Sequence, residues 1–589
     1  MKEVLSYKKK LKLLRNLLKK KDCNYYLLPR TDKFQNEFIS EEDERVKWLT
    51  GFSGSFAFVI ISLKQNIIFT DGRYIDQIKK EVDQKTFKIL DINNKEPILW
   101  LKDKIQAKEK VLLDSWLFSC NKFNYLKKIV KEKKSKILLN KEILIDKIWK
   151  KKPNKIINKI FIRETKYSGI FFKNKIQHVK KILKDKKINS FFFSSPESIS
   201  WLLNIRSNQI KYTPIVLSFL LLNLNEKSFF FSKKNKNLEK YFSSYFIIFD
   251  LQDLREILIN FSITNKEIYL DPNKTPYFIE NFFKTIGVKV KYSQDPCENL
   301  KLIKNPIEIK GFKSSHIRDG VSVCKFLFWL DEIIKKNKKV SEIITSKKLF
   351  EFRKKNKLFR GLSFETISSF GSNGSIIHYR VSTKTNKILK KNNLYLYDSG
   401  AQYLDGTTDV TRTICIGDNP TQEQKDRFTR VLKGNLGLSN YSFSDRTTGS
   451  VLDKIARRHL KKKNLDYPHG TGHGVGSYLS VHEGPISISK SSKTKFKKGM
   501  VLTNEPGFYK TNQYGIRIEN IMLVIKKKKL LGFEILTLVP IDIKLIDTKL
   551  LNIQEKNWLN IYHKKVFNKI FKYLNKKERK WLKEKTAPI

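Results

Sequence analysis

The sequence predicts a multidomain protein of mixed α/β and α+β class, in which two α/β segments precede a longer segment rich in strands. Its 589 residues are too many for a single hydrophobic core, so about three to four domains are expected. Short apolar strands alternate with helical stretches in the first half of the chain, and strands dominate from Leu394 onward.

The first segment, residues 1–160, opens on a basic stretch whose leucines are separated by lysines. This pattern predicts an amphipathic helix rather than a secretory signal, which needs an uninterrupted apolar region. Residues 57–61 and 66–70 are short apolar strands, and the turn-rich residues 48–55 lead into the first of them. We therefore expect an α/β domain here.

The second segment, residues 161–304, repeats this plan loosely. Residues 200–206 resemble residues 47–52 in pattern, and the apolar residues 216–221 then correspond to the strand that begins at Ala57. The likeness lies in the pattern and not in residue identity, so it predicts a duplicated α/β domain.

The third segment, residues 305–545, begins with a helical pattern of apolar residues and continues mainly in strands. The final residues, 546–589, have apolar residues at helical spacing. They are too few to fold alone, so we expect a small helical extension that docks on the third domain.

The bulk composition argues against several classes of function. The net charge of +60 comes from 118 basic and 58 acidic residues, and the lysines are spread along the chain rather than gathered in one arm. No nucleic-acid-binding motif accompanies them, so we expect a solvated surface and no specific nucleic acid partner. No apolar run approaches the length of about 20 residues that spans a bilayer. The five cysteines lack CxxC spacing, which argues against disulfides and, with the absence of a signal, favours the cytoplasm.

The strongest functional signal is a set of five metal-binding side chains in the last third of the chain. They are Asp398, Asp409, His473, Glu505 and Glu519. Four carboxylates and one imidazole are a donor set for two divalent ions, which share a water when they lie about 3.5–4 Å apart. Oxygen-rich sites of this kind suit Mn²⁺, Co²⁺ or Fe²⁺, whereas zinc usually takes more nitrogen or sulfur ligands.

Turn signals suggest how these side chains could converge. Asp398 ends one alternating run and Asp409 opens another, with the hairpin signal Asp405-Gly406 between them. Glu505 and Glu519 flank a second turn-rich segment in the same way. A single Asp in a hairpin is usually a turn residue. That explanation does not account for five candidate ligands that each lie in a distinctive local motif.

Further polar residues accompany the five. His469 and His473 are four apart, but the glycines between them predict a strand and turn and not a helical zinc pair. His378 and His482 could donate to a developing oxyanion or hold one end of a substrate. Arg517 lies two residues before Glu519, on the same face of a strand, and could support that ligand by hydrogen bonding.

These motifs resemble the pita-bread metallopeptidases, and specifically aminopeptidase P (Xaa-Pro aminopeptidase) in its long three-domain form. The resemblance is carried by residues 364–368, 378–380, 398–403, 469–476, 504–509, 48–55, 70–74 and 586–589. It implies creatinase-like α/β domains at residues 1–160 and 161–304, a pita-bread catalytic domain at 305–545 and the extension at 546–589.

The resemblance also implies an activity: removal of the N-terminal residue from peptides with proline in second position. Two Mn²⁺ ions are implied, with Asp398 on one ion, His473 and Glu505 on the other, and Asp409 and Glu519 touching both. A metal-bridging hydroxide would attack the Xaa-Pro bond, and Glu505 would shuttle the proton. His378, His469 and His482 would bind substrate and stabilise the intermediate, and a homodimer is expected.

Two alternatives remain at this point. A prolidase-type dipeptidase has the same fold, but residues 48–55 and 586–589 argue against it. A non-catalytic pita-bread module, such as a histone chaperone, would suit the basic charge but does not need metal ligands. Function must be argued from the site, and all five ligands are present, which favours the enzyme.

Overall fold

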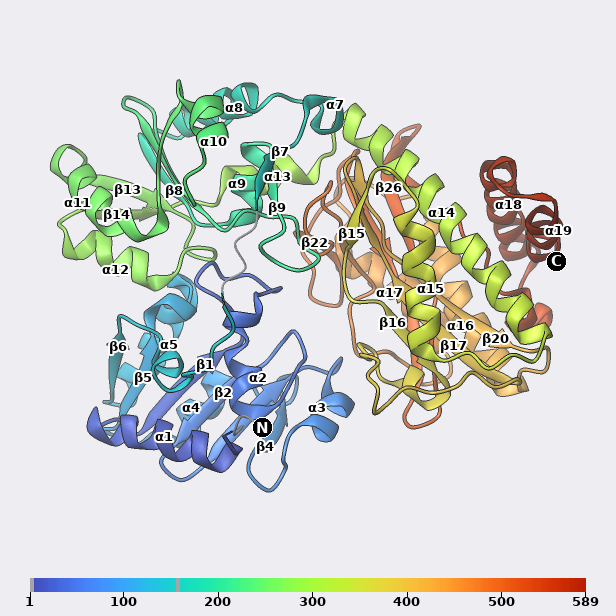
Figure 1. Cartoon of the computed structure of the whole chain (residues 1–589), viewed down its shortest axis with the longest axis horizontal. Helices are drawn as coiled ribbons and strands as arrows, with labels where there is room; N and C mark the ends of the chain where they lie inside the picture. The colour runs from blue at the N-terminus through green and yellow to red at the C-terminus, as the bar shows by residue number, and fades with distance from the viewer. Residues whose placement is uncertain (1–4, 155–158) are drawn as a thin grey trace. The chain divides into compact units, whose positions relative to one another are not determined.

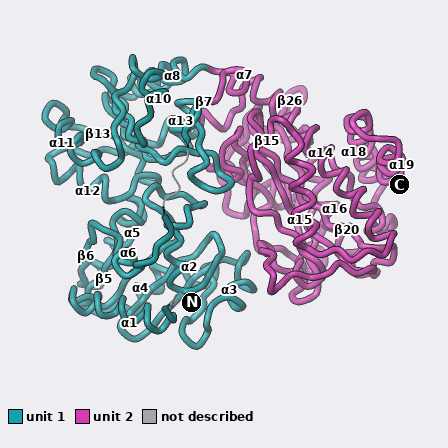
Figure 2. Tube along the Cα trace, in the orientation of Figure 1, with its two compact units in different colours: residues 1–162, 171–298 teal, residues 163–170, 299–589 magenta. Residues whose placement is uncertain are grey.

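The computed structural model describes residues 5–154 and 159–589 and divides the chain into two compact units. Unit 1 consists of residues 1–162 and 171–298, and unit 2 consists of residues 163–170 and 299–589 (Figure 2). Both units combine helices with sheets, which confirms the predicted α/β and α+β class (Figure 1).

The first sheet of unit 1 has six strands in the order β4-β3-β2-β1-β5-β6. Its strands are β1 (Tyr25–Pro29), β2 (Phe58–Ser62), β3 (Asn66–Thr70), β4 (Lys88–Asp91), β5 (Lys110–Asp114) and β6 (Lys136–Asn140). The helices are α1 (Tyr7–Lys20), α2 (Arg45–Thr50), α3 (Ile75–Glu81), α4 (Pro97–Lys104), α5 (Cys120–Glu132) and α6 (Leu144–Ile148). Helix α1 buries Leu11, Leu14 and Leu18, so the predicted opening helix is confirmed from Tyr7; residues 1–4 lie outside the described part.

The second sheet of unit 1 repeats the first, in the order β12-β11-β10-β8-β13-β14. In both sheets the successive pairings are parallel, antiparallel, antiparallel, parallel and parallel, which confirms the predicted duplication. The strands are β8 (Ser190–Phe193), β10 (Phe219–Asn223), β11 (Ser228–Phe231), β12 (Phe246–Phe249), β13 (Glu267–Leu270) and β14 (Lys289–Tyr292). The accompanying elements are β7 (Ile160–Ile162), α8 (Phe172–Asp185), α9 (Pro196–Leu202), β9 (Ile205–Ser207), α10 (Lys236–Phe242), α11 (Leu254–Thr264) and α12 (Tyr277–Thr285).

Unit 2 takes in the short helix α7 (Thr165–Ser168) and continues after α13 (Pro296–Leu302) with the long helix α14 (Pro306–Lys335) and α15 (Glu342–Lys354). Asn305 caps α14 by accepting from the backbone N–H groups of Ile307 and Glu308. The strands are β15 (Phe359–Leu362), β16 (Ile367–Phe370), β17 (Asn393–Ser399), β18 (Ala401–Tyr403), β19 (Gly406–Thr407), β20 (Val410–Ile416), β21 (Gly472–Gly474), β22 (Glu483–Ile488), β23 (Val501–Asn504), β24 (Gly507–Lys510), β25 (Tyr514–Arg517), β26 (Asn520–Lys527) and β27 (Leu530–Ile535).

The expectation that strands simply dominate after Leu394 is incomplete. Two helices, α16 (Gln422–Ser439) and α17 (Gly449–Lys461), separate β20 from β21 and pack on the strands that follow. The signal was present in the sequence, since Phe428, Val431, Leu432 and Leu436 have helical spacing and are all buried.

The C-terminal residues form α18 (Ile553–Ile570) and α19 (Lys576–Lys585), which dock on unit 2 as predicted. Tyr562 of α18 accepts a hydrogen bond of 2.7 Å from Arg412 and donates one of 2.6 Å to the carbonyl of Val539. The indole of Trp581 donates to Asp331 of α14 at 2.8 Å. The extension therefore shares the core and the polar network of unit 2.

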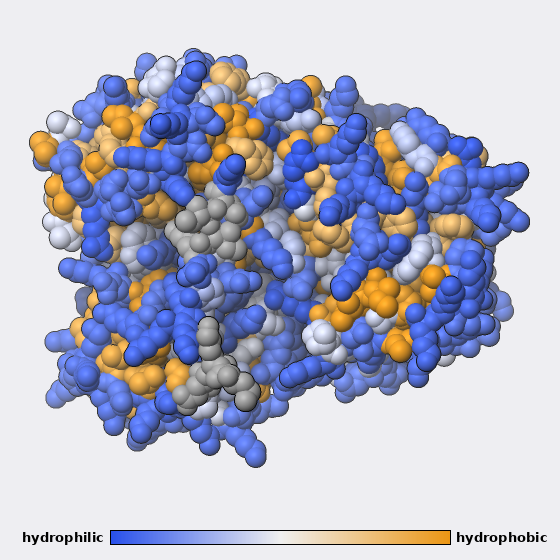
Figure 3. Space-filling view, in the orientation of Figure 1, coloured by the Kyte–Doolittle hydropathy of each residue, from blue (hydrophilic) through white to orange (hydrophobic). Residues whose placement is uncertain are grey.

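The charged residues are spread over the surface, as the sequence suggested. Hydrophilic residues cover most of the visible face over both units (Figure 3). Within the described residues, no helix combines the length and apolarity needed to cross a bilayer. All five cysteines are buried free thiols, so the expected absence of a disulfide framework is confirmed for these positions.

Tyr562→Phe should lower the free energy of unfolding by about 1–3 kcal/mol, because a buried hydrogen-bonded hydroxyl is lost and Arg412 keeps one fewer acceptor. Guanidinium denaturation measures the change. Tyr573→Phe is the control, since Tyr573 is 47% exposed and its loss should have little effect. Equal stability of the two variants would contradict the proposed anchoring role.

Candidate metal centre and active site

Two adjacent antiparallel strands bring Asp398 and Asp409 to one place. Strands β17 and β20 pair with Asp398 opposite Thr411 and Ser399 opposite Val410. Asp409 comes directly before β20, so it lies at the same end of the pair as Asp398. The predicted turn at Gly406 forms a small hairpin, β18–β19, between the two strands. Strand pairing thus brings together two carboxylates that are eleven residues apart in the chain.

A second strand pair does the same for the two glutamates. Asn504 at the end of β23 lies opposite Asn520 at the start of β26, so Glu505 and Glu519 flank the same end of this pair. Asn435 of α16 holds both segments, because its amide donates to the carbonyls of Asn504 at 2.9 Å and Ile518 at 3.0 Å. Sequence reasoning could not have selected Asn435, because its partners lie 69 and 83 residues away along the chain.

His473 lies on strand β21 with its ring beside these acids. The Nδ1–H group donates to the carbonyl of Gly474 at 2.9 Å, so Nε2 is the ring nitrogen that faces the acids and could bind a metal. That Nε2 lies 3.7 Å from Oδ2 of Asp409 and 3.5 Å from Oε1 of Glu505. One ligand atom each from Asp409, His473 and Glu519 lie within 4.8 Å of one another. This spacing is compatible with a shared metal ion.

The acids of this cluster are buried without enough partners. Asp398, Asp409 and Glu519 are at most 8% exposed, and Oδ1 of Asp398 and Oδ1 of Asp409 have no hydrogen-bond partner. Burial, reinforced by repulsion from neighbouring carboxylates, raises the pKa of Asp409 and of Glu519 well above the ordinary range. Burial also raises the pKa of Glu505 to about 7, although Arg517 opposes this shift. Divalent cations would offset the repulsion, so the donor set fits a metal centre.

Arg517, at the end of β25, connects the cluster to its surroundings. Its guanidinium donates to Oδ2 of Asp398 at 2.7 Å, to the hydroxyl of Thr411 at 3.1 Å and to the hydroxyl of Tyr509 at 2.6 Å. Thr411 in turn donates to Oε2 of Glu519 at 2.7 Å. Arg517 thus supports Asp398 directly, and Glu519 only through Thr411, which refines the expectation that it would assist Glu519.

Thr411 and Tyr509 are polar residues of the site that the sequence analysis did not select. Thr411 could have been found, because it stands two residues after Asp409 and therefore faces the same side of the strand. Tyr509 could not, because its position beside Arg517 results from the pairing of β24 with β25.

The three further histidines lie around the cluster. His469 donates through Nδ1 to the carbonyl of Gly470 at 2.7 Å and accepts through Nε2 from Tyr509 at 3.0 Å. The ring of His482 contacts that of His473 edge to face, with centroids 4.3 Å apart. His378 is half-buried and follows Ile377, whose carbonyl accepts from Arg517 at 3.4 Å. The nine selected residues therefore belong to one region of unit 2, and no helix links His469 to His473.

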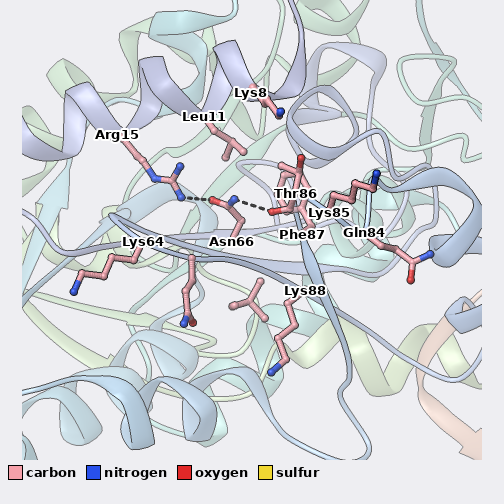
Figure 4. Close-up of a pocket in the computed structure, with 12 residues that line it drawn as sticks. Lys8, Leu11, Arg15, Lys64, Asn66, Gln84, Lys85, Thr86, Phe87 and Lys88 are labelled. Carbon is pink, nitrogen blue, oxygen red and sulfur yellow. Dashed lines mark hydrogen bonds between the residues drawn. The ribbon is translucent and has the colours of Figure 1, made fainter.

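A separate pocket of about 610 Å³ in unit 1 offers a different environment (Figure 4). Arg15 lies on its wall and donates to Asn66, which donates to the carbonyl of Thr86. Four lysines line it, but none of its lining residues is an aspartate, glutamate, histidine or cysteine. It therefore lacks the donors that a divalent metal requires.

Four family models match the chain. The model of metallopeptidase family M24 matches residues 312–526, and the model of the C-terminal region of peptidase M24 matches residues 529–589. Two models of the creatinase/prolidase N-terminal domain match residues 10–144 and 151–308.

The chain is similar to known proteins over its whole length. Xaa-Pro aminopeptidase 1 of Dictyostelium discoideum is 37% identical, covering 99% of this chain and 96% of that protein. A probable Xaa-Pro aminopeptidase P of Coprinopsis cinerea is 36% identical, covering 99% and 98%. The crystal structure of X-prolyl aminopeptidase from Caenorhabditis elegans, described as a cytosolic enzyme with a di-nuclear active site, matches with a TM-score of 0.94 at 32% identity, covering 99% of this chain and 100% of that one.

The apparent affinity of the metal-free protein for Mn²⁺ should rise between about pH 6 and pH 8, because a carboxylic acid must lose its proton before it binds a metal. Glu505, with a pKa of about 7, titrates in this range. Titration calorimetry in buffers of different ionisation enthalpy should detect more proton release at the lower pH. An affinity that does not change with pH would show that Glu505 is not a ligand.

Asp409→Asn should raise the melting temperature of the metal-free protein at pH 8. The folded-state pKa of Asp409 is raised, so its carboxylate destabilises the folded state at high pH, and stability falls as pH rises from the unfolded pKa of about 3.9. The gain from Asn should shrink toward pH 3, where the acid is mostly protonated in both states. Asp418→Asn, at an exposed position, is the control for thermal denaturation at both pH values.

Proposed function

Because the chain belongs to the Xaa-Pro aminopeptidases of metallopeptidase family M24, we propose that it removes the N-terminal residue from peptides with proline in second position. The observation that carries the proposal is the convergence of four carboxylates and one imidazole at the paired strand ends of unit 2. The similar Caenorhabditis elegans enzyme is described as having a di-nuclear active site.

We propose that Asp398, Asp409, His473, Glu505 and Glu519 hold two divalent ions, most suitably Mn²⁺. Oxygen-rich donors with a single imidazole support that choice over zinc. The ions would supply Lewis acidity and a nucleophile derived from water at neutral pH. The unpartnered oxygens of Asp398 and Asp409 provide the free lone pairs that such a site needs.

The side chains around the ligands have separate roles in this proposal. Glu505, whose carboxylate lies 3.5 Å from Nε2 of His473, can accept a proton and return it to the leaving nitrogen of proline. Arg517 donates to Tyr509, and Tyr509 donates to Nε2 of His469, so this chain of hydrogen bonds holds the ring of His469 beside the site. His378 and His482 are the donors that could hold the peptide carbonyl.

The alternatives are less well supported. The relatives that cover the whole chain are Xaa-Pro aminopeptidases, which disfavours a prolidase-type dipeptidase. A non-catalytic binding module would not need this cluster of buried acids. Their mutual repulsion opposes folding unless cations are bound.

Other features are proposed from the resemblance. We propose a creatinase-like domain at residues 1–160, a second at 161–304, the catalytic domain at 305–545 and the extension at 546–589. The order of the four family models, at residues 10–144, 151–308, 312–526 and 529–589, supports this arrangement. A cytoplasmic location agrees with the description of the nematode enzyme as cytosolic. We also propose a homodimer, which analytical ultracentrifugation would test.

Cleavage of an Xaa-Pro-Xaa peptide should depend on Mn²⁺ and exceed cleavage of an Xaa-Pro dipeptide and of a peptide without proline. Loss of a residue that only hydrogen-bonds to a metal ligand lowers activity by roughly 10- to 100-fold. Asp409→Asn removes a ligand, so it should lower kcat/KM by more than that. Asp418→Asn should leave the rate unchanged, since this side chain is exposed. Persistent cleavage by Asp409→Asn, or indifference to chelation, would refute the two-metal assignment.

A further inference from the structure

Two buried lysines meet one buried glutamate beside the candidate active site. Lys301, Lys304 and Glu483 are at most 3% exposed. Lys304 donates to Oε2 of Glu483, and Nζ of Lys301 lies 3.5 Å from Oε1 of the same carboxylate. Lys301 also donates to the carbonyl of Gly484 at 3.3 Å. Three charged groups are therefore out of water in one cluster, which is uncommon unless they are paired.

The glutamate of this cluster directly follows His482. Glu483 begins strand β22, where it lies opposite Gly474, the residue after His473. His482 lies in the bend that leads into β22 and is bonded directly to Glu483. The lysines hold the carboxylate of Glu483, and the ring of His482 contacts the ring of His473.

The lysines are themselves fixed to the strand that leads to Glu505. The backbone N–H of Lys304 donates to the carbonyl of Gly499 at 2.9 Å, and Ile303 forms an antiparallel bridge with Met500. Strand β23 begins at the next residue, Val501, and ends one residue before Glu505. Lys304 thus connects the backbone before Glu505 with the side chain after His482.

We propose that Lys301 and Lys304 are positioning residues that set the orientation of His482 through Glu483. The effect on catalysis rests on the function proposed above, in which His482 binds the substrate. The two lysines precede α14 and lie about 180 residues from Glu483 along the chain, so local sequence does not link them to the site. Their charge neutralises a carboxylate that would otherwise favour a turn of the segment toward solvent.

The first experiment measures the orientation of His482 without any assay of activity. Diethyl pyrocarbonate modifies accessible neutral histidines, and mass spectrometry of peptides gives the rate at His482 in the full-length protein. Lys304→Met should raise this rate several-fold by releasing Glu483. Lys433→Met is the matched control, because Lys433 also contacts one glutamate, Glu555, and one carbonyl, that of Leu550.

The second experiment tests whether Lys304 acts through His482. Lys304→Met should lower kcat/KM by about 10- to 100-fold, as expected for loss of a supporting partner. In a His482→Ala background, Lys304→Met should lower kcat/KM by less than about 2-fold. The effects of two substitutions add when the residues act independently, and they do not add when one residue acts through the other. Bound metal should stay at the wild-type level, since no ligand is altered.

The outcomes separate this proposal from the function itself. Unchanged modification of His482 in Lys304→Met, or full additivity with His482→Ala, would overturn the positioning role. A wild-type protein that does not cleave the peptides refutes the proposed function, and the modification rates still decide the role of the lysines. If Lys304→Met does not fold, Lys301→Met replaces it, because its nitrogen is the more distant of the two from Glu483.

Discussion

The crowding of buried carboxylates at one point is the constraint on which the rest of the catalytic unit depends. Asp409 and Glu519 have pKa values well above their ordinary range because burial and mutual repulsion both oppose ionisation. Such an arrangement lowers the stability of the metal-free protein and becomes favourable only when cations bind. The surrounding fold must therefore hold the acids together, because the carboxylates repel one another.

Strand pairing supplies most of that restraint. Asp398 and Asp409 flank one antiparallel pair, β17–β20, and Glu505 and Glu519 flank another, β23–β26. Each acid stands at or next to the end of a strand, so the backbone hydrogen bonds of the paired strands fix its position. Helix α16 then joins the second pair through Asn435, whose amide donates to the backbone carbonyl of the residue before each glutamate.

Buried cations connect these strands to the remainder of unit 2. Arg517 pairs with Asp398, whereas Arg412 donates to backbone carbonyls that include those of Glu519 and Val539 and to the hydroxyl of Tyr562 in the C-terminal extension. Lys301 and Lys304 pair with Glu483, the residue that follows His482. Each cation is held by several acceptors, which is the condition for burying a charge without a large loss of stability.

The sequence by itself determined the order and type of the metal-binding residues, the two similar α/β segments and the location of the turns, because these depend on local pattern. It also predicted the strand-and-turn setting of His473. Only the tertiary structure decided that Tyr509, Asn435 and the two lysines belong beside the site, and that Arg517 supports Asp398. These contacts join residues that lie far apart in the chain or come together through strand register, and no local preference encodes which distant strands pair.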